Sequence, residues 1–157
     1  MNLKSDFPIL NKKIRDNSIT YLDYAATTQK PVAVINSIKE FYENSYENVH
    51  RGMNSLSIDA TDQFERTRES VKEFINANST NEVIFTRGAT DSLNIIANSI
   101  TSKFEDSGEI LVTELEHHSN YLPWMNICKN SNLKLKIIPV NQNGIIDEQQ
   151  ILSLIHI

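Results

Sequence analysis

The fold is decided by the stretch Glu82-Val83-Ile84-Phe85-Thr86-Arg87-Gly88-Ala89-Thr90-Asp91-Ser92-Leu93-Asn94. Its β-branched and aromatic residues at 83–86 are typical of a strand, and a helical pattern of apolar residues begins at Thr90. Gly88 permits a tight turn between them, which leaves the first backbone N–H groups of the helix free to bind an anion. The stretch therefore predicts a strand-to-helix turn that binds phosphate. The alternative is an ordinary turn in which Thr90 only caps the helix.

Strand-like and helix-like segments alternate from this turn onward. The expected order is strand, helix, strand, helix and strand, at residues 83–85, 90–104, 110–113, around 124–127, and 133–140. Asp147 has the form of an N-cap and opens one last helix. Alternation of this kind indicates a parallel sheet with crossover helices, so the expected fold class is α/β with three strands.

The part of the chain before the turn is expected to be mainly helical. Residues 1–20 are interpreted as an N-terminal arm with a short helical turn, and residues 20–23 as a brief strand. Pro31 opens a first helix, since proline favours the start of a helix. A second helix at about 57–76 is expected to bury Phe64, Val71, Phe74 and Ile75.

Composition limits the classes of function. The 157 residues contain 15 Lys and Arg against 20 Asp and Glu, and the basic residues do not cluster, so no nucleic-acid partner is expected. No apolar run is long enough to span a membrane, and the polar N-terminus does not resemble a signal peptide, so a cytoplasmic protein is expected. Cys128 is the single cysteine, which predicts neither a disulfide framework nor a cysteine-based metal site, and no other metal site is predicted.

Four other motifs accompany the strand-to-helix turn. They are Tyr21-Leu22-Asp23-Tyr24-Ala25-Ala26-Thr27-Thr28-Gln29-Lys30-Pro31, Asn48-Val49-His50-Arg51-Gly52, Glu114-Leu115-Glu116-His117-His118-Ser119-Asn120 and Pro139-Val140-Asn141-Gln142-Asn143-Gly144. In this order and at this spacing, the set resembles the N-terminal part of a SufS-like cysteine desulfurase, a class V aminotransferase that uses pyridoxal 5'-phosphate (PLP). The resemblance implies an incomplete fold-type I PLP-dependent transferase large domain, with a parallel-rich sheet and crossover helices. Residues 1–20 would be its arm, and residues 21–157 its first part, truncated at the C-terminus.

The resemblance also implies roles for individual residues. The PLP phosphate would be bound by Gly88, Ala89 and Thr90. His117 would be the catalytic residue of this segment, stacking on the cofactor ring and transferring protons, with His118 in support. The substrate-binding residues would be Ala25, Ala26, His50 and Arg51. Plain packing for the two alanines, and a simple turn or a subunit contact for the His-Arg pair, remain open alternatives.

Several residues that the family's chemistry needs are not found in this sequence. The family's cofactor-binding lysine follows a histidine, and no His-Lys pair occurs here. The aspartate that faces the pyridine nitrogen, a downstream arginine and the nucleophilic cysteine are also absent. Cys128 is expected on the apolar side of a helix with Trp124 and Ile127, and we assign it no catalytic role. The chain is therefore expected to be an N-terminal fragment that is inactive alone.

The full-length parent is expected to convert L-cysteine to L-alanine and an enzyme-bound persulfide for iron–sulfur cluster assembly. Its implied partners are L-cysteine, a sulfur-acceptor protein of the SufE/SufU type and a second copy of itself in a homodimer. Two alternatives stay open. One is a fragment of a selenocysteine lyase or of another class V aminotransferase. The other is a short non-enzymatic protein that binds a phosphorylated ligand or a partner subunit.

Overall fold

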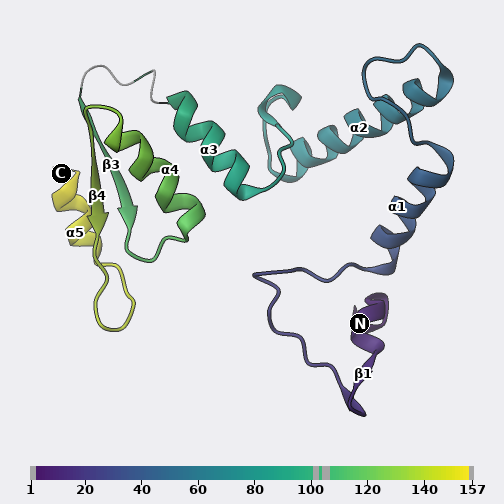
Figure 1. Ribbon diagram of the computed structural model, residues 1–157, viewed down its shortest axis with the longest axis horizontal. Helices are drawn as coiled ribbons and strands as arrows, with labels where there is room; N and C mark the ends of the chain where they lie inside the picture. Colours follow the sequence, from purple (N-terminus) through teal and green to yellow (C-terminus); the bar gives the residue numbers. More distant parts are fainter. Residues whose placement is uncertain (1–2, 101–102, 104–106, 156–157) are drawn as a thin grey trace. The chain divides into compact units, whose positions relative to one another are not determined.

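A computed structural model describes residues 3–100, 103 and 107–155, apart from the side chain of Gln150 (Figure 1). The chain forms two compact units, Met1–Val83 and Ile84–Ile157. The first unit is mainly helical, and the second contains a parallel pair of strands with helices. The boundary predicted at residue 20 separates an N-terminal arm from the large domain of a complete enzyme. It is a different division from that between these two units, and it stays a prediction.

The first unit begins with two short 3-10 helices, η1 (Leu3–Asp6) and η2 (Pro8–Asn11). They are followed by an antiparallel hairpin of β1 (Lys13–Ile14) and β2 (Asn17–Ser18). The two turn residues, Arg15 and Asp16, have φ angles of 49° and 64°, as tight hairpin turns require. The sequence predicted only a helical turn in this arm.

The strand predicted at residues 20–23 is wrong. These residues form no strand in the described structure, and the backbone turns at 24–26 directly after them. The Tyr21 hydroxyl donates to Asp23 O (3.1 Å) and to Thr27 O (2.6 Å), which closes a local loop. Extended backbone becomes a strand only when a neighbouring strand accepts its hydrogen bonds, and the described part of this unit offers none here.

Two long helices complete the first unit, together with the 3-10 helix η3 (Thr80–Glu82). Helix α1 (Val32–Asn44) begins directly after Pro31, which confirms the predicted start. Helix α2 (Ser55–Phe74) confirms the second predicted helix, and it begins at the N-cap Asn54, whose side chain accepts a hydrogen bond from Ser57 N (2.9 Å).

The predicted burial along α2 is only partly correct. Phe64 and Val71 are half-buried, but Phe74 is 91% exposed and Ile75 is 55% exposed. The fully buried positions of α2 are the small residues Ser57 and Ala60. The apolar end of α2 remains exposed because no described part of this unit packs over it.

The second unit is an α/β arrangement. Helix α3 (Ala89–Ile100) packs against α4 (His118–Lys129), which connects the parallel strands β3 (Gly108–Thr113) and β4 (Leu133–Ile138). The strands pair in register from Gly108↔Leu133 to Thr113↔Ile138. The core comprises Ala97, Val112, Pro123, Leu133 and Ile138. A parallel pair with a crossover helix confirms the predicted α/β fold class.

The start of this unit differs from the prediction, whereas its last helix agrees with it. Residues 83–85 form no strand among the described residues, because β3 and β4 pair only with each other there. The predicted three-strand sheet is therefore wrong for the described residues. The predicted end of the first helix, residue 104, lies outside the described residues. The last helix, α5 (Glu148–Leu154), confirms its predicted N-cap, since Asp147 Oδ1 accepts from Gln149 N (3.0 Å).

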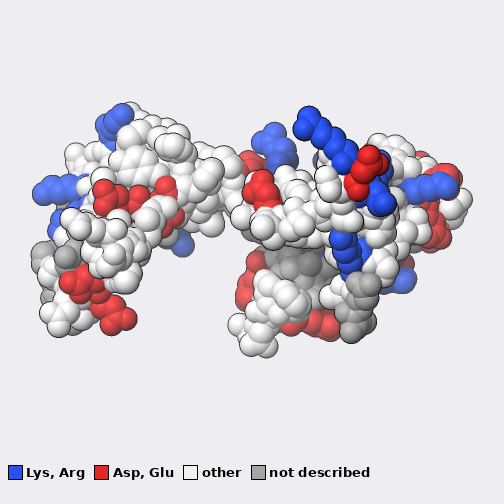
Figure 2. Space-filling view, turned by 90° about the horizontal axis from the view of Figure 1, so that it is seen from below, with Lys and Arg blue, Asp and Glu red and all other residues white. Residues whose placement is uncertain are grey.

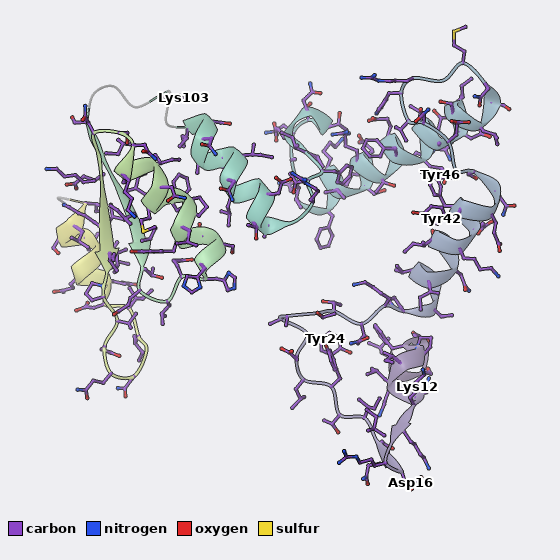
Figure 3. All side chains as sticks on the ribbon, viewed as in Figure 1. Lys12, Asp16, Tyr24, Tyr42, Tyr46 and Lys103 are labelled. Atoms are coloured by element: carbon purple, nitrogen blue, oxygen red, sulfur yellow. The ribbon has the colours of Figure 1, made fainter. Side chains whose placement is uncertain are left out.

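Both units carry large apolar side chains on their surfaces. In the first, the rings of Tyr42 and Tyr46 lie together near the end of α1, with 65% and 67% of their surface exposed (Figure 3). In the second, Ile84 is 73% exposed and Ile137 of β4 is 47% exposed. Natural parallel sheets are covered on both faces, so these apolar surfaces are expected to lie against further protein.

We therefore expect the isolated chain to bind a dye for exposed apolar groups and to be insoluble, self-associated or partly molten. Dye fluorescence combined with size-exclusion chromatography and light scattering measures both properties. A monomer that unfolds cooperatively and binds no dye would contradict this expectation. Such a monomer would favour the alternative of a finished, non-enzymatic protein.

Candidate functional site

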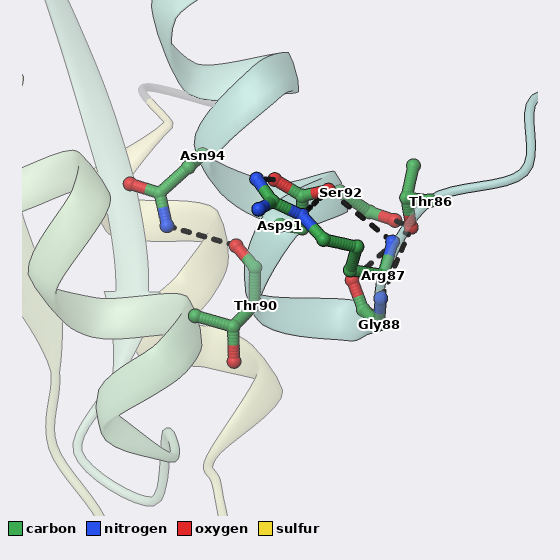
Figure 4. Close-up of polar contacts among 7 residues, drawn as sticks. All are labelled: Thr86, Arg87, Gly88, Thr90, Asp91, Ser92 and Asn94. Atoms are coloured by element: carbon green, nitrogen blue, oxygen red, sulfur yellow. Dashed lines mark hydrogen bonds and ion pairs between the residues drawn. The ribbon is translucent and has the colours of Figure 1, made fainter.

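The predicted strand-to-helix turn is held by hydrogen bonds among its own side chains (Figure 4). Thr86 Oγ1 lies 2.7 Å from Ser92 Oγ and accepts from Gly88 N (3.4 Å). Gly88 has a φ of 152°, which residues with a side chain rarely adopt. The glycine is therefore required by the backbone conformation of the turn.

The first turn of α3 presents unpaired donors. The first helical hydrogen bond runs from Ser92 N to Gly88 O (3.1 Å), so the N–H groups of Ala89, Thr90 and Asp91 have no acceptor in the described part of the chain. The Thr90 hydroxyl likewise has no partner there and points away from its neighbours (Figure 4). A hollow of about 360 Å³ lies at this turn, lined by Arg87, Gly88, Thr90, Asp91 and Asn94. Free amides at the positive end of a helix form an anion site.

An ion pair that the sequence analysis missed lies beside this hollow. Arg87 N donates to Asp91 Oδ2 (3.2 Å), and the Arg87 guanidinium contacts both carboxylate oxygens at 3.5 Å. The backbone and side-chain hydrogen bonds from Arg87 lower the pKa of the Asp91 carboxyl. Because the carboxylate is matched by a cation, its charge opposes a bound anion less than an unpaired carboxylate would. The available signal was an arginine four residues before an aspartate at the predicted start of a helix.

His117 lies at the carboxyl end of β3 and is the N-cap of α4. Its Nδ1 accepts from Ser119 N (3.1 Å) and lies 2.9 Å from Ser119 Oγ. Because Nδ1 is an acceptor, the neutral ring carries its proton on Nε2. The His117 side chain is exposed, and the His118 ring lies 6.3 Å from it. Helices α3 and α4 pack together and begin at the same end of the unit (Figure 1).

The His-Arg-Gly segment of the first unit is fixed to the start of α2. His50 N donates to Thr61 Oγ1 (2.9 Å), and His50 Nε2 lies 3.2 Å from Glu65 Oε1. A side chain at Gly52 would place its Cβ 2.2 Å from Ser57 Oγ, so only glycine fits. Arg51 is exposed and has no partner among the described residues. The segment therefore presents a free guanidinium from a rigid support.

The two predicted alanines lie in the turn at residues 24–26. Ala25 and Ala26 are both exposed, so they are not packed in the core of the first unit. Thr27 N donates to Asp23 O (3.1 Å), which closes the turn around them. Of the predicted site residues, Gly88, Ala89, Thr90 and His117 thus belong to the second unit, and Ala25, Ala26, His50 and Arg51 to the first.

Cys128 is half-buried in α4, and burial raises the pKa of its thiol. A raised pKa disfavours the thiolate, which is the nucleophilic form.

Within residues 3–155, the described side chains form no cluster of His, Cys, Asp or Glu suited to a metal ion. None of the described helices has the length and apolar character needed to cross a membrane. On the face shown in Figure 2, Lys and Arg side chains are scattered among acidic and uncharged ones.

A family model described as aminotransferase class-V matches residues 20–156 of the chain. The chain belongs to the class-V aminotransferase family. Solved structures agree with this family at the level of the fold. The apo structure of a cysteine desulfurase from Thermococcus onnurineus superposes with a TM-score of 0.86 at 32% identity, over 97% of this chain and 36% of that one.

The curated relatives are named as desulfurases. A probable cysteine desulfurase of Borreliella burgdorferi is 48% identical over 155 residues, which make up 98% of this chain and 37% of the relative. A cysteine desulfurase of Cronobacter sakazakii is 40% identical over 153 residues, covering 97% of this chain and 38% of the relative. The predicted resemblance to cysteine desulfurases and the predicted fold-type I fold are confirmed. This member of the class-V family spans little more than a third of the length of these relatives.

Proposed function

We propose that this chain is part of a PLP-dependent cysteine desulfurase, and we call the complete enzyme that contains it the parent desulfurase. The parent desulfurase would convert L-cysteine to L-alanine and an enzyme-bound persulfide. One observation carries this proposal: the N-terminus of α3 presents three free amides and a free threonine hydroxyl, at the same end of the unit as the exposed His117 of α4. The sequence likeness to named desulfurases supports it.

The donor set fits the phosphate group of PLP. A phosphate accepts several hydrogen bonds at once, and the amides of Ala89, Thr90 and Asp91 have no acceptor among the described residues. The Thr90 hydroxyl belongs to the same first turn of α3 (Figure 4). Gly88 supplies the turn that leaves these amides free. Bound PLP supplies an electron sink for bond cleavage at the substrate's carbons. The lysine that would hold it covalently is assigned to the remainder of the parent desulfurase, since no His-Lys pair occurs in this sequence.

His117 would do two things for the bound cofactor. Its ring is exposed at the end of β3, where ligands of α/β sheets collect, so it is available to stack on the pyridine ring. Its Nδ1 is occupied by Ser119, which leaves the Nε2 proton as the one available for transfer. His117 would thus hold and move a proton at Nε2.

The first unit would contribute to binding L-cysteine. Arg51 presents a guanidinium with no partner in the described residues, and a guanidinium binds a carboxylate through two parallel hydrogen bonds. His50 would support it, and the exposed turn at Ala25 and Ala26 would let a small substrate approach the backbone. A sulfur acceptor of the SufE/SufU type, a homodimer and a cytoplasmic location for iron–sulfur cluster assembly belong to the same proposal.

The phosphate site is tested by Thr90→Ala in the parent desulfurase. The hydroxyl has no partner within the described residues, so its loss should leave the fold unchanged and remove one hydrogen bond to the phosphate. A charge-assisted hydrogen bond contributes about 1.5–3 kcal/mol, so PLP should bind about 10- to 10²-fold more weakly. Equilibrium dialysis against PLP measures the change.

The matched control for this test is Thr67→Ala. Thr67 is an exposed helical threonine of α2, and its hydroxyl bonds only to Gln63 O within its own helix (2.9 Å). This variant should bind PLP as the wild type does. Unchanged PLP affinity in Thr90→Ala would show that the phosphate lies elsewhere.

A further inference from the structure

A chain of side-chain hydrogen bonds joins the end of β3 to α4 around the His117 segment. Thr113 Oγ1 donates to Glu116 Oε1 (3.1 Å), and Asn120 Nδ2 donates to Glu116 Oε2 (2.7 Å). Trp124 Nε1 in turn donates to Asn120 Oδ1 (3.0 Å). All four side chains are half-buried, where hydrogen bonds are less exposed to competition from water. We call these four residues the Glu116 relay.

The direction of every hydrogen bond in the Glu116 relay is fixed. An indole N–H can only donate, so the carbonyl oxygen of Asn120 must face Trp124. The amide NH₂ of Asn120 therefore faces Glu116, which must supply an acceptor. Glu116 does so with one oxygen and receives the Thr113 hydroxyl with the other. The relay thus requires an acceptor at position 116 and a donor at position 120.

His117 and Ser119, whose backbone N–H donates to the His117 ring, lie between Glu116 and Asn120 along the chain, so the Glu116 relay spans them. His117 O accepts from Asn120 N (2.8 Å) and from Tyr121 N (3.1 Å), so the backbone of His117 is bound to the first turn of α4. On the strand side, Glu114 N donates to Ile138 O (2.9 Å) and Glu114 Oε2 accepts from Val140 N (3.2 Å). The loop between β3 and α4 is therefore held at both ends. Its one exposed catalytic candidate is left with a restricted orientation.

We propose that Glu116 and Asn120 are positioning residues for His117. They hold the first turn of α4 against the end of β3, so that the Nε2 edge of His117 keeps one orientation toward the cofactor and the substrate. Neither side chain needs to touch either ligand for this effect. The inference rests on the proposed function, because that function gives His117 its role.

The test exchanges the two groups of the Asn120–Glu116 pair in the parent desulfurase. Asn120→Asp keeps the size of the side chain and the acceptor for Trp124, but it sets two carboxylates against each other. Glu116→Gln should be tolerated, because the new amide oxygen can accept from Asn120 and the new NH₂ can donate to the Thr113 hydroxyl. In the double variant the new amide at position 116 donates to the new carboxylate at position 120. The pair is then restored with its direction reversed.

Asn120→Asp should lower kcat by about 10²-fold, since misplacing a catalytic group by about 1 Å has an effect of that size. KM for L-cysteine should change little. The double variant should recover most of the lost rate, and Glu116→Gln alone should remain near the wild type. Hydrogen exchange of the cofactor-free enzyme should show lost protection at the amides of residues 119–121 in Asn120→Asp and regained protection in the double variant. That readout does not depend on catalysis.

Asn126→Asp is the control, because Asn126 is an exposed asparagine of the same helix whose side chain has no partner in the described structure. It should leave both kcat and exchange unchanged. A normal kcat in Asn120→Asp despite lost protection would overturn the inference and make the relay purely structural. Failure of the double variant to recover the rate would also overturn it. If His117→Ala itself left kcat unchanged, the proposed role of His117 would fail first.

Discussion

Expressed alone, the 157-residue chain is expected to release no sulfide from L-cysteine and to show no visible absorption band of covalently bound cofactor. The sequence has no His-Lys pair to supply the expected attachment site. Its single thiol, Cys128, is half-buried with a raised pKa, which disfavours the nucleophilic thiolate. The whole enzymatic rate enhancement should be missing, and such enhancements are typically at least about 10⁶-fold.

A sulfide-release assay checks this expectation, with the parent desulfurase as the positive control and heat-treated chain as the blank. The absorption spectrum after addition of PLP gives an independent readout. Sulfide above the blank would mean that the segment carries a complete active site. Weak, reversible PLP binding without a shifted band would still be compatible with the free amides at α3.

In the parent desulfurase, His117→Ala is expected to lower kcat by about 10²–10⁴-fold, the usual contribution of a general acid–base group. The structure adds a second effect, because the His117 side chain also caps α4 through Ser119 N. Loss of an N-cap costs about 0.5–2 kcal/mol of stability. His117→Asn separates the two effects, since asparagine is a good N-cap but has no imidazole. His117→Asn should unfold at the wild-type temperature but should have the same lowered kcat as His117→Ala.

Steady-state kinetics and thermal unfolding of both variants measure the two effects. His118→Ala is the matched control, because His118 is the first residue of α4 and its ring makes no hydrogen bond within the described residues. It should stay near the wild-type rate. If His118→Ala lowered kcat while His117→Ala kept the wild-type kcat, the catalytic role would belong to His118.

Local patterns in the sequence predicted the helices and the parallel pair of strands β3 and β4. They did not predict which other segments form paired strands. Pro31 and Asp147 marked helix starts correctly, because caps depend on a few neighbouring residues. The β-branched run at 83–85 gave a strand that the described structure does not contain. The hairpin at residues 13–18 was missed although its turn is short. A strand at 83–85 would need partners far away in the chain, which a local pattern does not report. The hairpin pairs residues only three and five positions apart, so its polar turn at Arg15 and Asp16 was a local signal that could have found it.

For the candidate site, the sequence predicted the turn at Gly88 and a role for His117, but not the side chains that support these two positions. Arg87 and Asp91 are four residues apart, as are Glu116 and Asn120, and Asn120 and Trp124. Asn120 and Trp124 both lie on α4, where side chains at this spacing meet, whereas Arg87 and Glu116 precede the first residues of α3 and α4. A search for polar pairs four residues apart would still have found all three contacts. The roles of the site residues stay predictions.

An imidazole that caps the start of a helix and, under the proposed function, faces the cofactor has a consequence for protein engineering. Any selection for heat resistance in this segment would favour aspartate, serine, threonine or asparagine at position 117, because these are the best residues for beginning a helix. Each of them would remove the ring and the proton at Nε2. Thermostable variants chosen without a catalytic screen would therefore be well folded and would lack the acid–base group that the proposed function assigns to position 117.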